Sequence, residues 1–82
     1  MKAEQFRAKN QFLLVSEKGE YFQSYGSIIG FNPVKGKIQL DELYWDYSKT
    51  TGKYRNLWLG ENKKTTERKI KEGIYKLTNL NK

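Results

Sequence analysis

The side chains that most often carry out catalysis or bind metals are scarce in this sequence. It contains no cysteine and no histidine, which removes thiolate nucleophiles, the usual zinc ligands and the commonest general base. Three carboxylates, Asp41, Glu42 and Asp46, lie within six residues, but without a partner cluster they are a weak signal for a metal or acid–base site. No P-loop, dinucleotide-binding glycine motif or nucleophile elbow is present. We therefore expect a protein that is not an enzyme and has no metal or cofactor.

Aromatic and hydroxyl side chains are concentrated beside these acids, in the run Trp45-Asp46-Tyr47-Ser48. Trp and Tyr dominate binding hot spots, so one interpretation is a patch that binds another protein. The members of this candidate patch are Trp45, Tyr47, Tyr54 and Trp58. The alternative is structural: Asp46 and Ser48 cap a helix that follows, while Trp45 and Tyr47 anchor that helix to a sheet. The structural interpretation explains every residue at this spacing, and we favour it.

Positive charge is the third feature with functional meaning. The chain carries a net charge of +7, and residues 63–82 hold seven basic but only two acidic side chains. Such a basic end suits phosphate groups or an acidic protein surface. The candidate nucleic-acid-binding residues are Lys53, Arg55, Lys63, Lys64, Arg68, Lys69 and Lys71. No helix-turn-helix, zinc-finger or ribonucleoprotein signature accompanies them, and a solvated lysine face explains them equally well.

The elements that must position these residues belong to a small α+β fold. With 82 residues the chain is long enough for one domain, and its 15% aromatic content supplies large rings for a thin core. Residues 1–10 show little pattern and predict a loosely ordered lead-in, so the single domain is placed at residues 11–82. Short apolar runs predict strands at 11–16, 21–25, 27–32, 37–40 and 74–80, the first two joined as a hairpin through Gly19. In the second strand, alternation places Tyr21, Gln23 and Tyr25 on one face and Phe22 with Ser24 on the other.

Two helices are expected after residue 48. Ser48 is suited to cap a helix over 49–59 that ends at Gly60, although a strand over 54–59 remains the rival assignment. A second helix over 62–73 has Thr65 or Thr66 as its predicted cap. The predicted fold class is α+β, a small antiparallel sheet of three to five short strands with one or two helices packed on one face.

Part of the chain resembles an uncharacterised family of small proteins encoded by bacteriophages and prophages of low-GC Gram-positive bacteria. The resemblance covers nearly half of the chain and is carried by an SY-x-x-I segment followed by an L…WDYS-x-TT-x-x-Y…L segment. The matching residues are Ser24, Tyr25, Ile28, Leu40, Trp45, Asp46, Tyr47, Ser48, Thr50, Thr51, Tyr54 and Leu59. The resemblance implies a phage setting and supplies no activity.

Two functions follow as expectations. The first is a phage accessory protein of the host-takeover or anti-defence type, which binds a host or defence protein, such as a nucleic-acid-processing complex, through the aromatic patch. The second is a nucleic-acid-binding module that uses the basic C-terminal third. A homodimer through a Tyr- and Trp-rich face is left open. Because the start is polar and no apolar run approaches the roughly 20 residues of a membrane span, we expect no membrane partner and a cytoplasmic location in the bacterial host.

Overall fold

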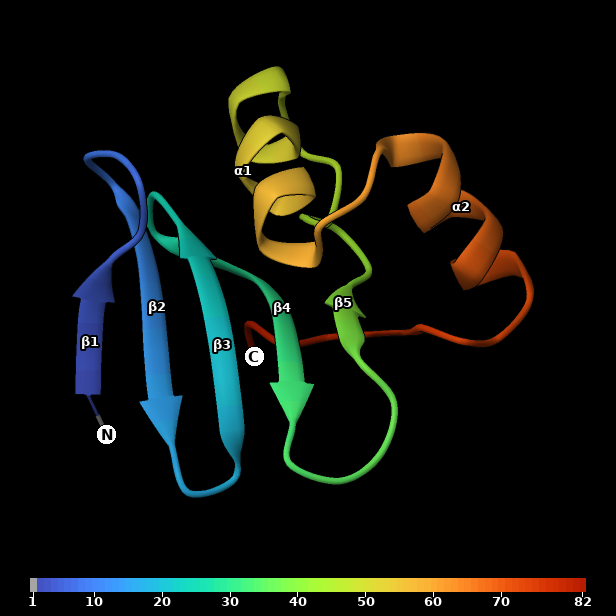
Figure 1. Ribbon diagram of the computed structural model, residues 1–82, viewed down its shortest axis with the longest axis horizontal. Coiled ribbons are helices and arrows are strands. Elements are labelled where there is room, and N and C mark those ends of the chain that lie inside the picture. The colour runs from blue at the N-terminus through green and yellow to red at the C-terminus, as the bar shows by residue number, and fades with distance from the viewer. Residues whose placement is uncertain (1) are drawn as a thin grey trace.

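The fold is one sheet with two helices connecting its last two strands, and the computed structural model describes residues 2–82 (Figure 1). The elements are β1 (Lys2–Gln5), β2 (Gln11–Ser16), β3 (Gly19–Ser24), β4 (Ser27–Pro33), β5 (Gln39–Asp41), α1 (Lys49–Leu59), α2 (Lys63–Lys71) and β6 (Lys76–Thr78). The prediction of an α+β protein is confirmed. No helix among residues 2–82 is long and apolar enough to cross a membrane.

All six strands lie in the sheet in chain order, which corrects the predicted count of three to five. Strands β1 to β5 form an antiparallel meander, whereas β6 runs parallel to β5, so the sheet is mixed and not purely antiparallel. The reason is the connection: a parallel neighbour needs a crossover, and α1 with α2 supplies it.

Strand β1 lies within the segment 1–10, for which the sequence predicts a loosely ordered lead-in; residue 1 of that segment lies outside the described residues. It pairs with β2 from Lys2 opposite Val15 to Gln5 opposite Phe12. All four of its side chains are exposed, so no alternation of polar and apolar residues marks it in the sequence. The next residue, Phe6, packs edge-on against Phe22, with ring centroids 5.8 Å apart, and this contact ties the segment to the core.

The hairpin of β2 and β3 forms as predicted, and Tyr21 and Phe22 lie on opposite faces as expected, but β3 ends at Ser24 and Tyr25 lies in the turn that follows. Phe22 and Ser24 face α1, where the Ser24 hydroxyl hydrogen-bonds that of Thr51 at 3.0 Å. Tyr21 lies on the opposite face, stacked on Phe31 with centroids 4.3 Å apart. The buried apolar core contains Phe22, Ile29, Phe31, Leu40 and Tyr75.

Helix α1 occupies the predicted residues, so the rival strand assignment for 54–59 is wrong. The Ser48 side chain accepts a hydrogen bond from the Thr51 N–H at 3.1 Å, which satisfies one of the free donors of the first turn. Gly60 ends the helix with φ of 70°, a conformation that favours glycine. The Trp58 ring packs 5.6 Å from Phe22, and its Nε1–H donates to Glu20 at 2.8 Å.

Helix α2 begins one residue later and ends two residues earlier than the predicted range 62–73. Asn62 caps it by accepting from the Thr65 N–H at 2.9 Å, so neither Thr65 nor Thr66 is the cap. The Thr66 hydroxyl instead donates to Glu61 at 2.7 Å, inside the structure. The helix ends at Lys71, and Gly73, with φ of 77°, turns the chain back toward β6.

The C-terminal segment is held to the sheet by two side chains. The carboxylate of Asp41 is buried and accepts backbone N–H groups from Leu43, Tyr44 and Leu80. The Asn81 amide pairs with both the N–H and the carbonyl of Ile28, at 2.7 and 2.9 Å, so it imitates a neighbouring strand beside β4. Strand β6 itself covers only Lys76–Thr78, shorter than the predicted 74–80, because these contacts replace regular pairing beyond it.

The close approach of Trp58 to β4 makes Gly30 sensitive to substitution. A Cβ atom at Gly30 would lie 2.5 Å from Cζ3 of Trp58, so we expect Gly30→Ala to lower the free energy of unfolding by about 1–3 kcal/mol through overpacking. Urea denaturation followed by tryptophan fluorescence measures this change. The matched control is Gly26→Ala, whose Cβ would meet open space. Equal unfolding free energies for the two variants would contradict the packing described for Trp58.

Candidate functional site

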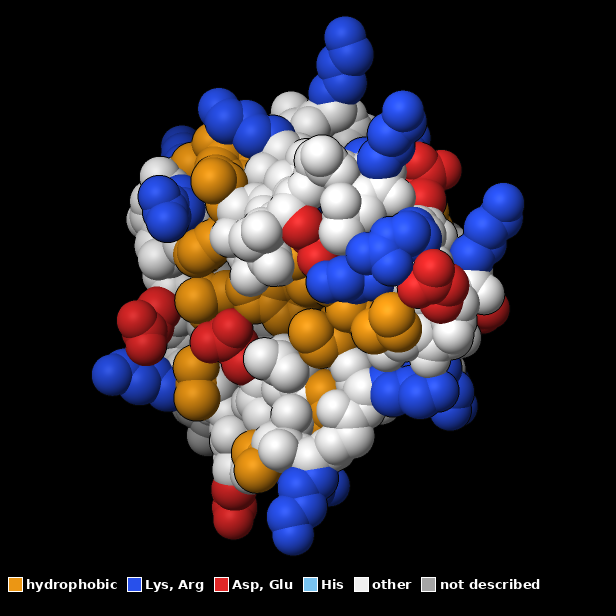
Figure 2. All heavy atoms as spheres, turned by 45° about the vertical axis from the view of Figure 1, so that its right-hand side comes forward, with side chains coloured by type: hydrophobic (Ala, Val, Ile, Leu, Met, Phe, Trp, Pro, Cys, Tyr) orange, Lys and Arg blue, Asp and Glu red, His pale blue; other side chains and the backbone are white. Residues whose placement is uncertain are grey.

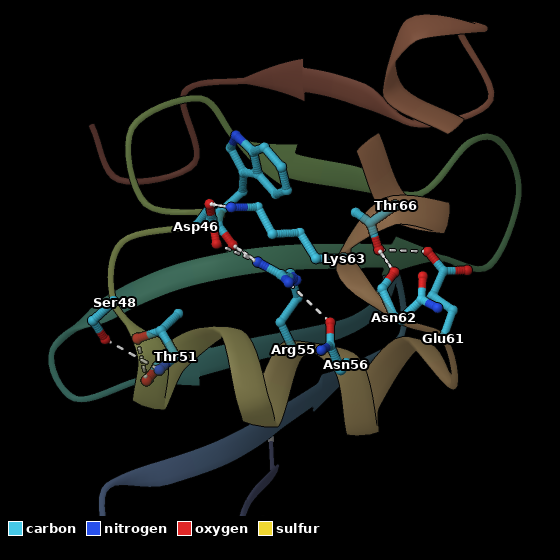
Figure 3. A network of polar contacts seen from close by, with 11 residues as sticks. Asp46, Ser48, Thr51, Arg55, Asn56, Glu61, Asn62, Lys63 and Thr66 are labelled. Atoms are coloured by element: carbon cyan, nitrogen blue, oxygen red, sulfur yellow. Dashed lines mark hydrogen bonds and ion pairs between the residues drawn. The ribbon is translucent and has the colours of Figure 1, made fainter. Parts of the chain in front are cut away.

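A buried ion pair joins α1 to the segment that precedes it (Figure 3). Arg55 is only 1% exposed; its Nη1 donates to Asp46 at 3.0 Å and to the carbonyl of Trp45 at 2.8 Å, and its Nη2 donates to Asn56 at 2.8 Å. The guanidinium also lies 5.2 Å from the centre of the Trp45 ring. Arg55 is therefore an internal cation that fixes Trp45, and it is not available to phosphate as the sequence suggests.

Asp46 extends this pair to the second helix. Its other carboxylate oxygen lies 2.7 Å from Nζ of Lys63, in the first turn of α2. Burial alone would raise the pKa of Asp46, but the hydrogen bonds from Lys63 and Arg55 outweigh it and hold that pKa below its usual value. The same contact raises the pKa of Lys63. Asp46 thus joins both helices and stays ionised at neutral pH, and it does not cap α1 as the structural interpretation proposed.

A second polar cluster fixes the far end of α2. Glu61 accepts hydrogen bonds from Thr66, from Nζ of Lys69 at 2.7 Å and from the hydroxyl of Tyr75 at 2.9 Å. Burial would raise the pKa of Glu61, yet these donors lower it overall. Burial first, and then the hydrogen bond to Glu61, raises the pKa of Tyr75. Lys69, another predicted phosphate ligand, is therefore paired with a carboxylate of the protein itself.

The remaining cations of α2 line a groove beside Trp45, which we call the α2 groove. It is about 510 Å³ in volume and is lined by Trp45, Lys64, Glu67, Arg68, Ile70 and Lys71. On the face of the molecule that carries α2, hydrophobic atoms form a band across the middle, and Lys and Arg side chains project around it (Figure 2). Lys64, Glu67, Arg68 and Lys71 share one side of the helix because they are spaced by three or four residues.

This groove combines members of both sets predicted from the sequence. Trp45 comes from the aromatic set, and Lys64, Arg68 and Lys71 come from the basic set. Arg68 has an exposed ion pair with Glu72 at 2.9 Å, a contact that costs little to break. The groove can therefore offer an aromatic ring and cations to the same ligand.

The other predicted aromatic residues are not brought together with Trp45. Tyr54 lies half-buried on α1 with Nζ of Lys53 5.4 Å from its ring centre, and Trp58 packs on the sheet. Tyr47 is 68% exposed, so it does not anchor α1 to the sheet. The four aromatic residues thus occupy separate places and do not form one patch.

Tyr47 belongs instead to a pocket that was not predicted from the sequence. The pocket is about 450 Å³ in volume, and eight of its nine residues carry hydroxyl groups; they are Ser24, Tyr25, Ser27, Ile29, Tyr44, Tyr47, Ser48, Thr50 and Thr51. Tyr25 stands in its turn with φ of 58°, a strained conformation for tyrosine, while the adjacent Gly26 has no positive φ. The available signal was the SY-x-x-I and WDYS-x-TT segments, since six of their residues, Ser24, Tyr25, Tyr47, Ser48, Thr50 and Thr51, line this pocket.

The predicted acidic group does not assemble into a metal or acid–base site. Asp41 is buried and occupied by backbone N–H groups, whereas Asp46 is paired with Arg55 and Lys63. Among residues 2–82 no group of three or more His, Cys, Asp or Glu side chains is arranged to hold a metal ion. Asp41 therefore binds backbone groups of the protein itself, and Asp46 joins its two helices.

Comparison with known proteins gives a family and no activity. A family of unknown function (DUF8033) matches the chain over residues 1–73. No curated protein and no solved structure matches it. The matched span contains the α2 groove and the hydroxyl-lined pocket and ends before β6.

Removing the Asp46 charge tests the role of the ion pair. Asp46→Asn leaves Arg55 buried with a weaker partner, so we expect a loss of about 2 kcal/mol in unfolding free energy at pH 7, less than for a fully buried pair because Asp46 is partly exposed. The folded-state pKa of Asp46 is lowered, so its contribution is present above the unfolded pKa and is lost as the pH falls through the folded pKa. The difference between variant and wild type should therefore shrink below about pH 4.

Urea denaturation at pH 7 and at pH 3 measures both effects. The control is Glu72→Gln, which breaks only the exposed pair with Arg68 and should change stability by less than about 1 kcal/mol. A loss for Asp46→Asn that is no greater than that of Glu72→Gln would contradict the central role of Asp46.

Proposed function

Because the chain belongs to a family of unknown function (DUF8033) that brings no activity with it, we propose its function from geometry: a small non-enzymatic binding protein that docks through the α2 groove on an acidic surface of another protein. An apolar side chain of the partner sits against Trp45, and acidic side chains around it meet Lys64, Arg68 and Lys71. The partner is a host or defence protein in the bacterial cytoplasm, in the phage setting that the sequence resemblance implies.

The observation that carries this proposal is the composition of the groove. Trp and Arg are enriched at binding hot spots, where an apolar centre is surrounded by polar groups. Here Trp45 and Ile70 supply apolar surface, and the hydrocarbon parts of Lys64, Arg68 and Lys71 add to it while their charged ends project outward. Such a surface suits an apolar anchor flanked by carboxylates.

The position of Trp45 also favours a binding role. Its ring is fixed on one side by the Arg55 guanidinium, and its backbone carbonyl accepts from the same side chain. A ring held in place loses little conformational entropy when a partner binds, so more of the contact energy remains for affinity. The buried ion pair therefore supports a preorganised groove.

A protein partner is favoured over nucleic acid by the state of the basic side chains. Of the seven predicted phosphate ligands, Arg55, Lys63 and Lys69 are engaged with acidic groups of the chain itself, and Arg68 pairs with Glu72. Phosphate-backbone binding relies on several free cations, and only Lys53, Lys64 and Lys71 of the seven have no ion pair with an acidic side chain among residues 2–82. Nucleic acid is the second candidate, because Trp45 beside three cations could stack on an unpaired base.

The test compares two triple variants in pull-downs from a lysate of a low-GC Gram-positive bacterium. Lys64→Glu, Arg68→Glu and Lys71→Glu together should abolish retention of the partner protein, because they place negative charge around Trp45. The control carries the same charge change at exposed loop positions outside the groove, Lys9→Glu, Lys18→Glu and Lys35→Glu, and should retain the partner as wild type does. Nuclease treatment should leave retention unchanged.

Two results would contradict the proposal. One is equal retention of all proteins by the groove variant and the loop variant, which would show that the groove makes no specific contact. The other is loss of retention after nuclease treatment together with a gel shift of single-stranded DNA or RNA at micromolar protein and low salt. That second result would replace the protein partner with nucleic acid.

A further inference from the structure

Strand β1 lies at one edge of the sheet (Figure 1), and among residues 2–82 only β2 pairs with it, so its other edge is unpaired. Strand β6 lies at the opposite edge. Its four residues, Lys2 to Gln5, are all exposed. An edge strand offers a row of backbone N–H and carbonyl groups to any further strand, and proteins usually cover or block such an edge. The direction of these groups and the charges beside them decide which strand can add here.

The hydrogen bonds on either side of β2 show which β1 groups point outward. Phe6 N–H donates to the Gln11 carbonyl at 2.7 Å, so Phe6, and by alternation Glu4 and Lys2, direct their backbone groups toward β2. Tyr25 N–H donates to the Asn10 carbonyl at 2.7 Å, so by alternation the even-numbered residues of β2 form the hydrogen bonds to β3. The odd-numbered residues of β2 are then left to bond β1, which agrees with the bond between Phe6 and Gln11. The groups of Ala3 and Gln5 therefore face away from the sheet.

We propose that a second copy of this chain adds to this edge, with the two β1 strands antiparallel and Ala3 of one copy opposite Ala3 of the other. In this arrangement the two Ala3 residues exchange both N–H···O=C bonds across a twofold axis. Lys2 of each copy then lies directly opposite Glu4 of the other, on the face that carries α1. Cross-strand pairs of opposite charge stabilise a sheet, so the edge is complementary to itself.

The charges select this register from the alternatives. Gln5 is the other residue that faces outward, but a twofold axis through Gln5 would place Glu4 opposite Phe6 and Ala3 opposite Arg7, with no charge pair. A short edge strand with charges of one sign would repel a copy of itself. Lys2 and Glu4 have opposite signs and lie only 4.0 Å apart within one copy, on the same face of the strand.

The side chains beside β1 are compatible with this pairing and would add apolar contacts to it. On the face opposite α1, Ala3 lies beside Leu14, and Gln5 lies beside Phe12, both half-buried, so two copies would join their apolar strips across the small Ala3 side chains. The α2 groove lies on the other side of the molecule from β1 (Figure 1), so it stays free in each copy. The pair would carry two grooves, and a partner with two matching sites would bind it with added avidity. The pairing itself does not depend on the function proposed for the groove.

Sedimentation equilibrium of the untagged chain from micromolar to millimolar concentration tests the proposal. We expect the mass to rise from 9.7 kDa toward twice that value, with Kd on the order of 100 µM because the contact is small. Glu4→Lys places like charges opposite each other twice and should weaken the dimer about tenfold or more. The double variant Lys2→Glu, Glu4→Lys exchanges the charges and should restore the Kd to within about threefold of wild type.

Two further variants separate pairing from folding. Ala3→Pro removes the outward N–H but no bond to β2, and proline is tolerated on such an edge, so the variant should fold and stay monomeric at every concentration. Glu17→Lys makes the same charge change in the exposed β2–β3 turn and should leave the Kd unchanged. Circular dichroism checks the fold of each variant. The proposal would be overturned if the wild-type chain stayed monomeric at about 1 mM, which is about ten times the expected Kd. It would also be overturned if Glu4→Lys and Ala3→Pro left the dimer unaffected.

Discussion

The buried pair of Arg55 and Asp46 is the contact on which the arrangement of the helices depends. A guanidinium that is 1% exposed needs partners for its charge and its N–H groups, and Asp46, the Trp45 carbonyl and Asn56 provide them for its two terminal nitrogens, Nη1 and Nη2. Because Asp46 also holds Lys63, one carboxylate fixes α1, the chain before it and the start of α2. A domain of 82 residues has little apolar core to fix these elements by packing alone, so polar contacts determine their positions.

The parts of the fold that depend on local contacts could be read from the sequence. Helix α1 could be predicted because its cap, Ser48, and its end, Gly60, lie beside it in the chain. The alternation of Tyr21 and Phe22 likewise follows from strand geometry. Strand β1 could not be predicted, because its residues are all exposed and it is defined only by its pairing with β2. The parallel direction of β6 depends on the path of two helices, which no short window of sequence contains.

The site was harder to predict for a similar reason. The seven basic candidates look alike in sequence, yet their availability differs because their acidic partners lie up to 17 residues away, as for Lys63 and Asp46. Lys64 and Lys63 are neighbours, but only Lys64 lines the α2 groove. The aromatic candidates also separate, since Trp58 faces the sheet and Trp45 faces the groove. A count of charges or rings therefore overstates the surface that we propose for binding, and three-dimensional pairing reduces that proposed surface to one groove.

The ion pairs within the protein occupy several cations and leave a smaller set of cations beside Trp45. A protein with net charge +7 and all its cations exposed would attract any polyanion without orientation. Here several charges are balanced internally, so Lys64 and Lys71 stand beside an apolar ring and not within a uniform basic field. In the function that we propose, recognition requires an apolar group and acidic groups in a fixed relation, which a folded protein surface supplies more readily than a flexible phosphate chain. In the function that we propose, the carboxylates of Asp46 and Glu61 contribute to specificity as well as to the fold, because each pairs with a cation that would otherwise bind without discrimination.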